Sequence, residues 1–384
     1  MNKILIINTK YKKFGGEDAN ILDEIKLLKK NYTVNYLEFN NNSKLTFFDF
    51  LSFGICSNLK SNRLVKKRIK EFKPDLVYIH NTWFKANLGI FKVLEQTNLK
   101  VFHKLHNFRF QCSRSFLSKN HFQNNEVCPA CNLNSNSTGL FNKYYENSYL
   151  KSLSLILYSK KYFKIIKKNK IKILTITKFQ KKFLQNIGIA ENKIFLYHNP
   201  IQIPKIDNKN KSNFFVYAGR IDSSKGIENL IYSWIECNLK GYKLKIIGEI
   251  NKLEDIISNL NFSSYNIEFL GQLPNKEVLN LISKSKAVIT ATKMYEGQPR
   301  LLCEASSQNT LSIYPSFGGM DEFFPSGYKY AFEQNNYDDL KEKIFLIANH
   351  QDINSESKKV YNHINKILNN EKLLKDFKDI VDVE

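Results

Sequence analysis

The chain has 384 residues, of which 42% are hydrophobic and 24% are charged, and this is typical of a globular protein with two domains. No run of about 18 uncharged apolar residues occurs, which excludes a membrane-spanning helix, and the apolar start of the chain is too short for a signal peptide. Six cysteines without a signal peptide indicate reduced thiols and therefore a cytoplasmic protein.

The formal net charge of +22 favours an anionic partner. Basic residues cluster at residues 63–70 and 160–170, and the second cluster is interleaved with aromatic and aliphatic residues. Such a mixture fits the surface of an anionic membrane, and a solvated basic face would explain it as well. We interpret the apolar residues 47–56, just ahead of the first cluster, as a core segment rather than as an interfacial patch.

Strands and helices alternate through the first half of the chain. The apolar pattern predicts strands at residues 3–8, 34–39, 75–80, 100–105, 171–177 and 194–197. It predicts a helix that ends near residue 30, further helices at residues 64–72, 83–96, 143–170 and 179–187, and an irregular segment at residues 107–142. This alternation is typical of a parallel, doubly wound sheet.

A second half of the same kind follows a linker at residues 198–204, which contains two prolines. Its first strand starts at residue 214 and ends in a glycine turn, and its first helix spans residues 227–237. Further strands are expected at residues 244–248, 267–271, 287–290 and 311–314, and a last helix at residues 357–377. The predicted fold class is therefore α/β, with two Rossmann-like doubly wound parallel sheets.

The segment from Tyr295 to Ala305 carries two carboxylates eight residues apart, Glu296 and Glu304. Glu296 belongs to a Glu-Gly-x-Pro turn, and the proline suits the first turn of a helix, which places Glu304 about a turn and a half inside that helix. Two acceptors staggered in this way, with Gly297 beside the first, can hold several hydroxyls of one sugar nucleotide. A surface turn followed by a solvated helix is the alternative.

Two cations lie on the loop that follows the first strand of the second half. Arg220 and Lys225 both precede the helix at residues 227–237, whose free N–H groups favour anions. Two cations beside a helix N-terminus can neutralise a diphosphate leaving group without a metal ion. Each residue alone would be interpreted as a solvated surface charge.

The Gly-Arg-x4-Lys-Gly segment at residues 219–226 and the Glu-x7-Glu segment at residues 296–304 resemble motifs of a known family. This family comprises the retaining, nucleotide-sugar-dependent glycosyltransferases of family 4, also named glycosyl transferases group 1. The resemblance covers almost the whole chain and is strongest at residues 173–319. It implies the GT-B fold, in which two Rossmann-like domains face a central cleft.

The resemblance also implies a division of labour between the two halves. Residues 1–198 would form the acceptor-binding domain and residues 205–356 the donor-binding domain. The C-terminal helix, at about residues 357–384, would pack back on the first domain. The family commonly needs no metal or other cofactor and retains the anomeric configuration of the transferred sugar.

Under this resemblance, the second half supplies most of the donor site. Arg220 and Lys225 would stabilise the departing diphosphate, which makes them catalytic as well as donor-binding. Glu296, followed by Gly297, would hold hydroxyls of the donor sugar and take part in catalysis. Glu304 would accept hydrogen bonds from the ribose.

The first half contributes three further candidates. Gly15 and Gly16 follow the first strand, where the family places a glycine-rich loop that approaches the donor closely, although a plain turn would use the same residues. His106 follows the strand at residues 100–105, and its position matches a family histidine that contacts the donor sugar or the reaction centre. We therefore expect His106 to be catalytic, whereas a lone histidine after a strand is more often structural.

Cysteines and histidines gather between residues 103 and 131. Cys112, Cys128 and Cys131 could hold a structural zinc ion together with His121 as the fourth ligand. The four-cysteine spacing of an ordinary zinc site is incomplete here, so a loop with reduced thiols remains the other interpretation. No catalytic metal is expected.

The expected enzyme is a hexosyl- or related transferase that moves a sugar from a nucleotide-sugar to a saccharide or a lipid-linked saccharide. Its resembled relatives in bacteria often build capsule, O-antigen or lipopolysaccharide. A peripheral position on the inner face of the cytoplasmic membrane would suit such acceptors. The alternatives are a basic nucleic-acid-binding protein, which would show a nucleic-acid module that the sequence lacks, and a GT-B-like epimerase or phosphorylase.

Overall fold

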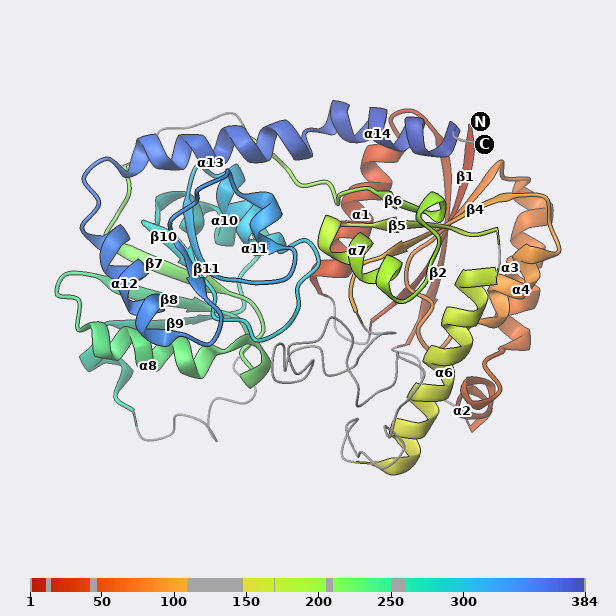
Figure 1. The fold of residues 1–384 in the computed structure, drawn as a ribbon, viewed down its shortest axis with the longest axis horizontal. Coiled ribbons are helices and arrows are strands. Elements are labelled where there is room, and N and C mark those ends of the chain that lie inside the picture. The colour runs from red at the N-terminus through yellow and green to blue at the C-terminus, as the bar shows by residue number, and fades with distance from the viewer. Residues whose placement is uncertain are drawn as a thin grey trace. The chain divides into compact units, whose positions relative to one another are not determined.

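The structure is a computed structural model that describes residues 2–11, 15–41, 47–108, 148–168, 170–204, 210–249 and 260–382 (Figure 1). The chain divides into two compact units. Among the described residues, the first unit contains those up to Pro200 and those from Asn370 onward, and the second contains Ile201–Asn369.

The first unit is built on a six-stranded parallel sheet of order β2-β1-β3-β4-β5-β6. Its strands are β1 (Lys3–Lys10), β2 (Thr33–Asn40), β3 (Leu76–Ile79), β4 (Lys100–Leu105), β5 (Lys172–Thr175) and β6 (Ile194–Leu196). Its helices are α1 (Gly16–Leu28), α2 (Phe47–Gly54), α3 (Leu59–Phe72), α4 (Gly89–Glu95), α6 (Tyr149–Lys168), α7 (Lys178–Asn186) and α14 (Asn370–Asp382). Four consecutive residues of β1, from Ile4 to Ile7, are fully buried, as expected of a parallel strand that is covered on both faces.

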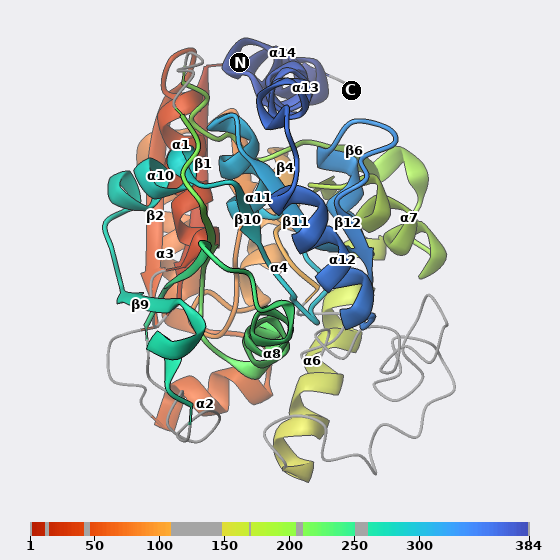
Figure 2. The same cartoon turned by 90° about the vertical axis from the view of Figure 1, so that its left-hand side faces the viewer.

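The second unit has a parallel sheet of order β12-β11-β10-β7-β8-β9. Its strands are β7 (Phe214–Ala218), β8 (Lys243–Ile247), β9 (Ile267–Gly271), β10 (Ala287–Ile289), β11 (Leu311–Ser316) and β12 (Ala331–Glu333). Its helices are α8 (Ile227–Cys237), α10 (Asn275–Lys284), α11 (Arg300–Ser307), α12 (Tyr337–Ala348) and α13 (Ile353–Leu368). Helices α8 and α12 lie side by side (Figure 2). This is the strand order of a Rossmann fold, so the prediction of two doubly wound parallel sheets is confirmed.

The C-terminal segment differs from the single helix predicted at residues 357–377. The structure has two helices, α13 and α14, which meet at Asn369 in an extended conformation. Only α14 belongs to the first unit, where Phe377 packs against Tyr78 and Tyr197 and is fully buried. The amphipathic pattern runs through both helices, and the break at Asn369 hardly disturbs it, which is why the sequence suggested one element.

Two further predictions need correction, and one strand was missed. The helix predicted at residues 83–96 is limited to α4, because Phe84 and Asn87 have positive φ angles of 70° and 65°. The segment at residues 47–56 contains α2 and is not a plain core segment, since Leu51 and Ile55 are more than half exposed. Strand β12 was not predicted, because three residues at the edge of a sheet carry almost no periodic signal.

Candidate active site

The predicted donor-site residues of the second unit lie at one point of its sheet. The strand order reverses between β7 and β10, because the chain runs outward from β7 through β8 and from β10 through β11. Ligands of open parallel sheets bind beyond the carboxyl ends of the strands at such a switch point. Arg220 and Lys225 follow β7, and Glu296 follows β10, so the topology brings the two predicted motifs together.

Lys225 and Glu296 are in direct contact. The Lys225 ammonium group and Glu296 Oε1 form an ion pair, and the Thr292 hydroxyl donates to the same carboxylate oxygen at 3.3 Å. The side chains of Lys225 and Glu296 are 21% and 24% exposed, so an incoming ligand can reach both. The site thus presents a cation and a carboxylate within one hydrogen bond of each other.

The loop that carries Lys225 is held by its own hydrogen bonds. The Asp222 carboxylate accepts from the backbone N–H groups of Ser224 and Lys225 at 3.0 and 3.2 Å and so caps a short 3-10 turn (Ser223–Lys225). The backbone N–H of Lys293 donates to the Ser224 carbonyl at 3.0 Å. The loops after β7 and β10 are therefore tied together independently of the Lys225–Glu296 pair.

Two glycines let these loops approach each other. Gly226 has a φ of 66°, and a Cβ atom there would lie 1.9 Å from the carbonyl oxygen of Ala291. A Cβ atom on Gly248, after β8, would lie 2.1 Å from the Gly219 carbonyl oxygen. Because both obstacles are backbone atoms, no side-chain rotation can relieve them. Backbone packing thus explains Gly226, the last glycine of the Gly-Arg-x4-Lys-Gly motif, and Gly248 outside the motif.

We predict that Gly226→Ala lowers the free energy of unfolding by about 2–4 kcal/mol, because the new methyl group would displace the loop after β10. Urea denaturation followed by Trp234 fluorescence would measure the loss. Gly241→Ala is the matched control, since Gly241 also has a positive φ of 78° but open space around its Cβ position, and it should cost only about 1 kcal/mol. Equal losses in the two variants would show that the close approach to Ala291 does not matter.

Arg220 and Glu304 are near the same strand ends but have other partners. The side chain of Arg220 is 67% exposed and lies 3.4 Å from Asp222 Oδ2. Glu304, the fifth residue of α11, is 7% exposed and accepts from Arg300 Nε at 2.8 Å. Arg220 is therefore available to an anionic ligand, whereas Glu304 shares its charge with Arg300.

In the first unit, His106 forms a pair that the sequence did not reveal. His106 follows β4 and His80 follows β3, and His106 Nε2 lies 2.8 Å from His80 Nδ1, so one ring nitrogen donates to the other. Burial lowers the pKa of both histidines well below the ordinary value, which keeps the rings neutral. The sequence places His80 only at a strand end, and the pairing depends on the adjacency of β3 and β4.

Gly15 and Gly16 lie at the start of α1, which follows β1. The Gly15 N–H donates to Asp18 Oδ2 at 3.1 Å, and a Cβ atom at Gly15 would meet none of the described residues within 4 Å. Neighbouring Glu17 accepts from the side-chain amide of Asn107 at 2.8 Å. The structure thus brings the helix N-terminus next to the residue after His106, but packing does not require a glycine at position 15.

A buried ion pair lies beneath these residues. Lys104 Nζ is 2.9 Å from Glu24 Oε2, and both side chains are fully buried. The Tyr78 hydroxyl donates to the other Glu24 oxygen at 2.6 Å, and Lys104 also donates to the His198 carbonyl at 3.2 Å. A buried pair with this many additional hydrogen bonds fixes the geometry of the strand ends around it.

The predicted zinc ligands Cys112, Cys128, Cys131 and His121 lie outside the described residues. Within the described part of the chain, no group of three or more histidine, cysteine or acidic side chains is arranged to hold a metal ion. A search of the same residues finds no helix that combines the length and the apolar character needed to cross a membrane.

Comparison with protein families finds one similarity in the second unit. Residues 199–362, less than half of the chain, match the model of Glycosyl transferases group 1. Two curated relatives carry related descriptions. The uncharacterized glycosyltransferase MJ1178 of Methanocaldococcus jannaschii is 26% identical over 197 residues, which are 50% of this chain and 54% of the relative. The amylovoran biosynthesis glycosyltransferase AmsD of Erwinia amylovora is 25% identical over 146 residues, which are 35% of this chain and 40% of the relative.

The matched segments thus span about half of these relatives' own length or less. Among solved structures, HepE of Anabaena, determined in complex with UDP and glucose, aligns over 99% of both chains with a TM-score of 0.70 at 13% identity. At that identity the likeness concerns the fold. The chain therefore has the GT-B fold, and residues 199–362 are similar to the Glycosyl transferases group 1 family.

Proposed function

We propose that this protein transfers a sugar, a hexose or a relative of one, from a nucleotide-sugar to a saccharide or lipid-linked saccharide, with retention of anomeric configuration. The observation that carries the proposal is the Lys225–Glu296 pair at the switch point of the second sheet. The match of this unit to Glycosyl transferases group 1 supports it.

The proposed donor separates the ion pair that the structure contains. Its diphosphate takes the Lys225 ammonium group, and its sugar hydroxyls donate to the Glu296 carboxylate. Arg220, largely exposed at the same strand end, adds a second cation. Charge builds up on the diphosphate as the glycosidic bond to the donor breaks, so both cations stabilise the transition state more than the ground state.

Other residues have supporting parts in the proposal. Glu304 accepts hydrogen bonds from the ribose while Arg300 holds its carboxylate in place. In the first unit, His106 contacts the donor sugar or the reaction centre as a neutral ring, because burial lowers its pKa well below the ordinary value. Gly15 and Gly16 contact the donor at the N-terminus of α1, which lies beside His106 because Glu17 accepts from Asn107. The mechanism needs no metal ion.

The acceptor is proposed to belong to a bacterial surface polysaccharide, such as capsule, O-antigen or lipopolysaccharide. The description of AmsD as an amylovoran biosynthesis glycosyltransferase supports this class of product. The acceptor chemistry would be a saccharide with a free hydroxyl, carried on a lipid or on a growing chain.

Product analysis tests the transfer reaction. The protein would be incubated with UDP-, GDP-, ADP- and CMP-sugars together with saccharide acceptors and with a lipid extract. We expect nucleoside diphosphate release that depends on the acceptor, and a product whose anomeric configuration, read by NMR, equals that of the donor. Conversion of a sugar nucleotide without any acceptor would instead indicate an epimerase, and an inverted product would exclude retention.

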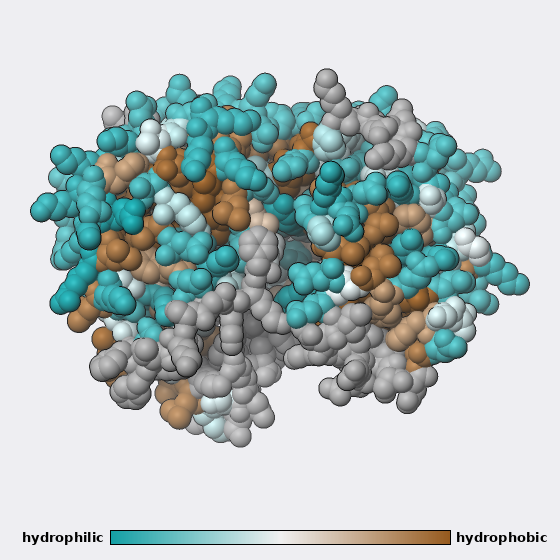
Figure 3. Space-filling model, turned by 180° about the vertical axis from the view of Figure 1, so that it is seen from behind, coloured by the Kyte–Doolittle hydropathy of each residue, from teal (hydrophilic) through white to brown (hydrophobic). Residues whose placement is uncertain are grey.

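The first unit also has a surface suited to an anionic membrane, which we name the α2–α3–α6 surface. Six large apolar side chains on it are 53–77% exposed: Leu51, Ile55, Leu59, Tyr149, Leu150 and Leu157. Figure 3 shows apolar atoms at the lower left, at the N-terminal end of α6. Helices α2 and α6 are joined there, because Phe53 stacks on Tyr158 with ring centres 4.7 Å apart and Lys161 donates to the Ile55 carbonyl at 2.8 Å.

Helices α3 and α6 of this surface carry mainly positive charge. Helix α6 has no acidic residue and α3 has one, Glu71. The basic residues described on the two helices are Lys60, Arg63, Lys66, Lys67, Arg68, Lys70, Lys160, Lys161, Lys164, Lys167 and Lys168. Exposed leucines on helices rich in lysine and arginine are typical of a surface that lies on anionic lipid. We propose that this surface docks on the inner face of the cytoplasmic membrane.

We predict that the protein sediments with vesicles of phosphatidylglycerol and phosphatidylcholine, and that added salt weakens the binding. Leu150→Asp combined with Leu157→Asp should lower the partition coefficient about tenfold, because two leucines that would enter the lipid are replaced by charges that anionic lipid repels. Leu346→Asp, at a 41% exposed leucine in the second unit, is the control. Binding to oligonucleotides but not to vesicles would contradict the membrane assignment.

A further inference from the structure

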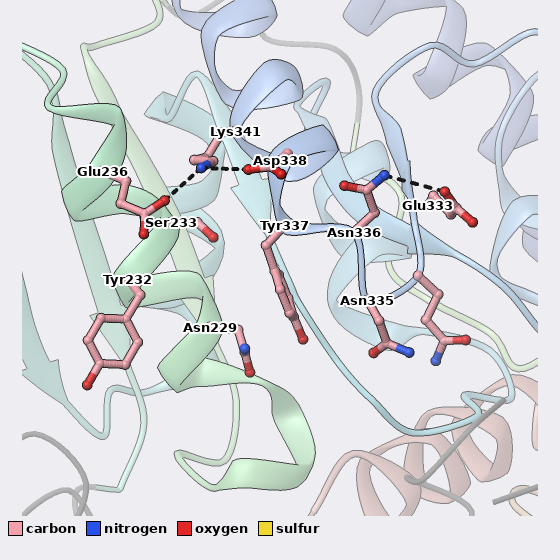
Figure 4. Close-up of a pocket in the computed structure, with 11 residues that line it drawn as sticks. Asn229, Tyr232, Ser233, Glu236, Glu333, Asn335, Asn336, Tyr337, Asp338 and Lys341 are labelled. Atoms are coloured by element: carbon pink, nitrogen blue, oxygen red, sulfur yellow. Dashed lines mark hydrogen bonds and ion pairs between the residues drawn. The ribbon is translucent and has the colours of Figure 1, made fainter. Parts of the chain in front are cut away.

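A pocket of about 640 Å³ lies in the second unit between α8 and the segment that joins β12 to α12 (Figure 4). Its size is within the range of roughly 300–1,000 Å³ found for small-molecule sites. The lining consists of four side-chain amides, three carboxylates, two tyrosines, one serine and one lysine. It shares no residue with the Lys225–Glu296 site.

The pocket wall is fixed by the secondary structure. Asn229, Ser233 and Glu236 fall on one face of α8 at the spacing of successive helical turns. On the other side, the Asn336 carboxamide oxygen accepts from the Asp339 N–H at 3.0 Å and caps α12. The side chain of Tyr337, the first residue of α12, lies between α8 and the β12–α12 segment (Figure 4).

One end of the pocket is closed by paired charges. Lys341 Nζ lies 2.7 Å from Glu236 Oε2 and 2.8 Å from Asp338 Oδ1 (Figure 4). The single cation of the lining is therefore already neutralised. The lining contains three carboxylates and one lysine and therefore carries a formal charge of −2. The net charge of the whole chain is +22.

Gln334 is a lining residue whose side-chain amide is not committed to a described protein partner. It lines the pocket and is 5% exposed, and neither atom of its side-chain amide has a hydrogen-bond partner among the described residues. The carboxamide oxygen of Asn229, across the pocket, likewise lacks a partner among them. Buried amides are normally hydrogen-bonded, so these two can turn toward a molecule in the pocket without breaking a hydrogen bond to a described residue.

The charge and the chemistry of the lining define the ligand. Carboxylates and carboxamide oxygens accept from hydroxyl groups, and amide N–H groups donate to them. The tyrosine rings offer apolar faces against which a sugar ring can lie. Excess negative charge disfavours phosphates, nucleotides and anionic lipids. We propose that this pocket binds a neutral saccharide.

This inference goes beyond the proposed transfer reaction. The pocket would hold a saccharide at a place separate from the Lys225–Glu296 pair, without taking part in bond formation. Such a second site raises the effective concentration of a long acceptor near the enzyme. Its occupation does not depend on donor binding, so the two proposals can fail independently.

Binding of neutral oligosaccharides tests the assignment. Maltohexaose, cellohexaose, and oligosaccharides of galactan and mannan would be titrated with the full-length protein by saturation-transfer NMR and calorimetry. We expect at least one to bind, and Gln334→Leu and Tyr337→Ala each to weaken that binding about tenfold or more. Lys225→Ala and the surface control Asn280→Ala should bind as wild type does.

Three results would overturn the proposal. The first is that no saccharide of the panel binds, and the second is that binding is equally strong in both pocket variants. The third is that binding is lost in Lys225→Ala alone, which would place the saccharide at the transfer site. Since Tyr337 and Gln334 are partly packed against the core, thermal unfolding of each variant would first establish that it is folded. The half-exposed Tyr232→Ala variant provides a third pocket change that leaves the core untouched.

Discussion

Replacing Lys225 with alanine is expected to lower turnover about 10²–10³-fold while the protein remains folded. Lys225 is the better-placed of the two cations beyond β7, because it already pairs with Glu296. Without its ammonium group the departing diphosphate loses a partner in the step where its charge develops. The effect should therefore appear mainly in kcat rather than in KM.

The fold should tolerate this substitution for a structural reason. Both partners are more than a fifth exposed, so the unpaired Glu296 carboxylate remains hydrated and still accepts from Thr292. The cost in stability should be at most about 1 kcal/mol, as for other exposed pairs. The loop itself is held by Asp222, whose bonds to backbone N–H groups do not involve the Lys225 side chain.

Lys243→Ala is the matched control for Lys225→Ala. Lys243 forms an ion pair with Glu268 in the same sheet, but it is the first residue of β8 and so lies at the end of the strand opposite to the proposed site. We expect its turnover to equal that of the wild type. If Lys225→Ala and Lys243→Ala have the same kcat, Lys225 has no place in the mechanism.

Acidification should destabilise the first unit far more than the second. Four histidines of the first unit have lowered pKa values, chiefly because they are buried: His80, His103, His106 and His198. Burial lowers the pKa of His103 and of His198 to about 4. In the second unit, His363 has a lowered pKa with burial as its main cause.

The sign of this pH effect follows from the number of protons bound by the folded and the unfolded chain. Below the unfolded-state pKa of 6.5, the unfolded chain binds protons that the folded first unit does not. The contribution of these buried histidines to the free energy of unfolding is therefore complete above that pKa, and it is lost as the pH drops below it. Between about pH 7.5 and about pH 5.5, each buried histidine lowers the free energy of unfolding by about 1.4 kcal/mol, so the four together lower it by about 5–6 kcal/mol.

The two tryptophans allow each unit to be followed separately, since Trp83 lies in the first unit and Trp234 in the second. Urea denaturation of Trp234→Phe and of Trp83→Phe at both pH values would measure the two losses. His198→Asn should reduce the pH dependence by one proton, because asparagine can donate the same bond to the Ile176 carbonyl that His198 Nδ1 makes at 2.9 Å. A Trp83 transition that does not move with pH would contradict the account.

Much of the fold could be predicted because parallel strands are continuous apolar runs. Strand β4 was predicted at its observed bounds, as were β9 and α8. The break between α13 and α14 could not be predicted, since it rests on one extended residue, Asn369. The exposure of α2 was also missed, because a run of apolar residues looks alike whether it faces a core or solvent.

The candidate site was predictable only where its members belong to one motif. Arg220, Lys225, Glu296 and Glu304 are marked by their spacing, and the strand order then explains why the two segments meet. The His80–His106 pair and the contact between Gly226 and Ala291 join residues far apart in the sequence. Such contacts depend on which strands are neighbours, and no local pattern encodes that. The amide-lined pocket was missed for the same reason.

The most direct test of the central claim is the thermal unfolding of the wild type and of Lys225→Ala with UDP-, GDP-, ADP- and CMP-sugars. We predict that one nucleotide class stabilises the wild type, by about 2.7 kcal/mol at a hundredfold excess over its Kd, and that Lys225→Ala loses this stabilisation. If no sugar nucleotide stabilises the protein while oligonucleotides do, the Lys225–Glu296 pair is not a donor site and the positive charge serves nucleic acid instead.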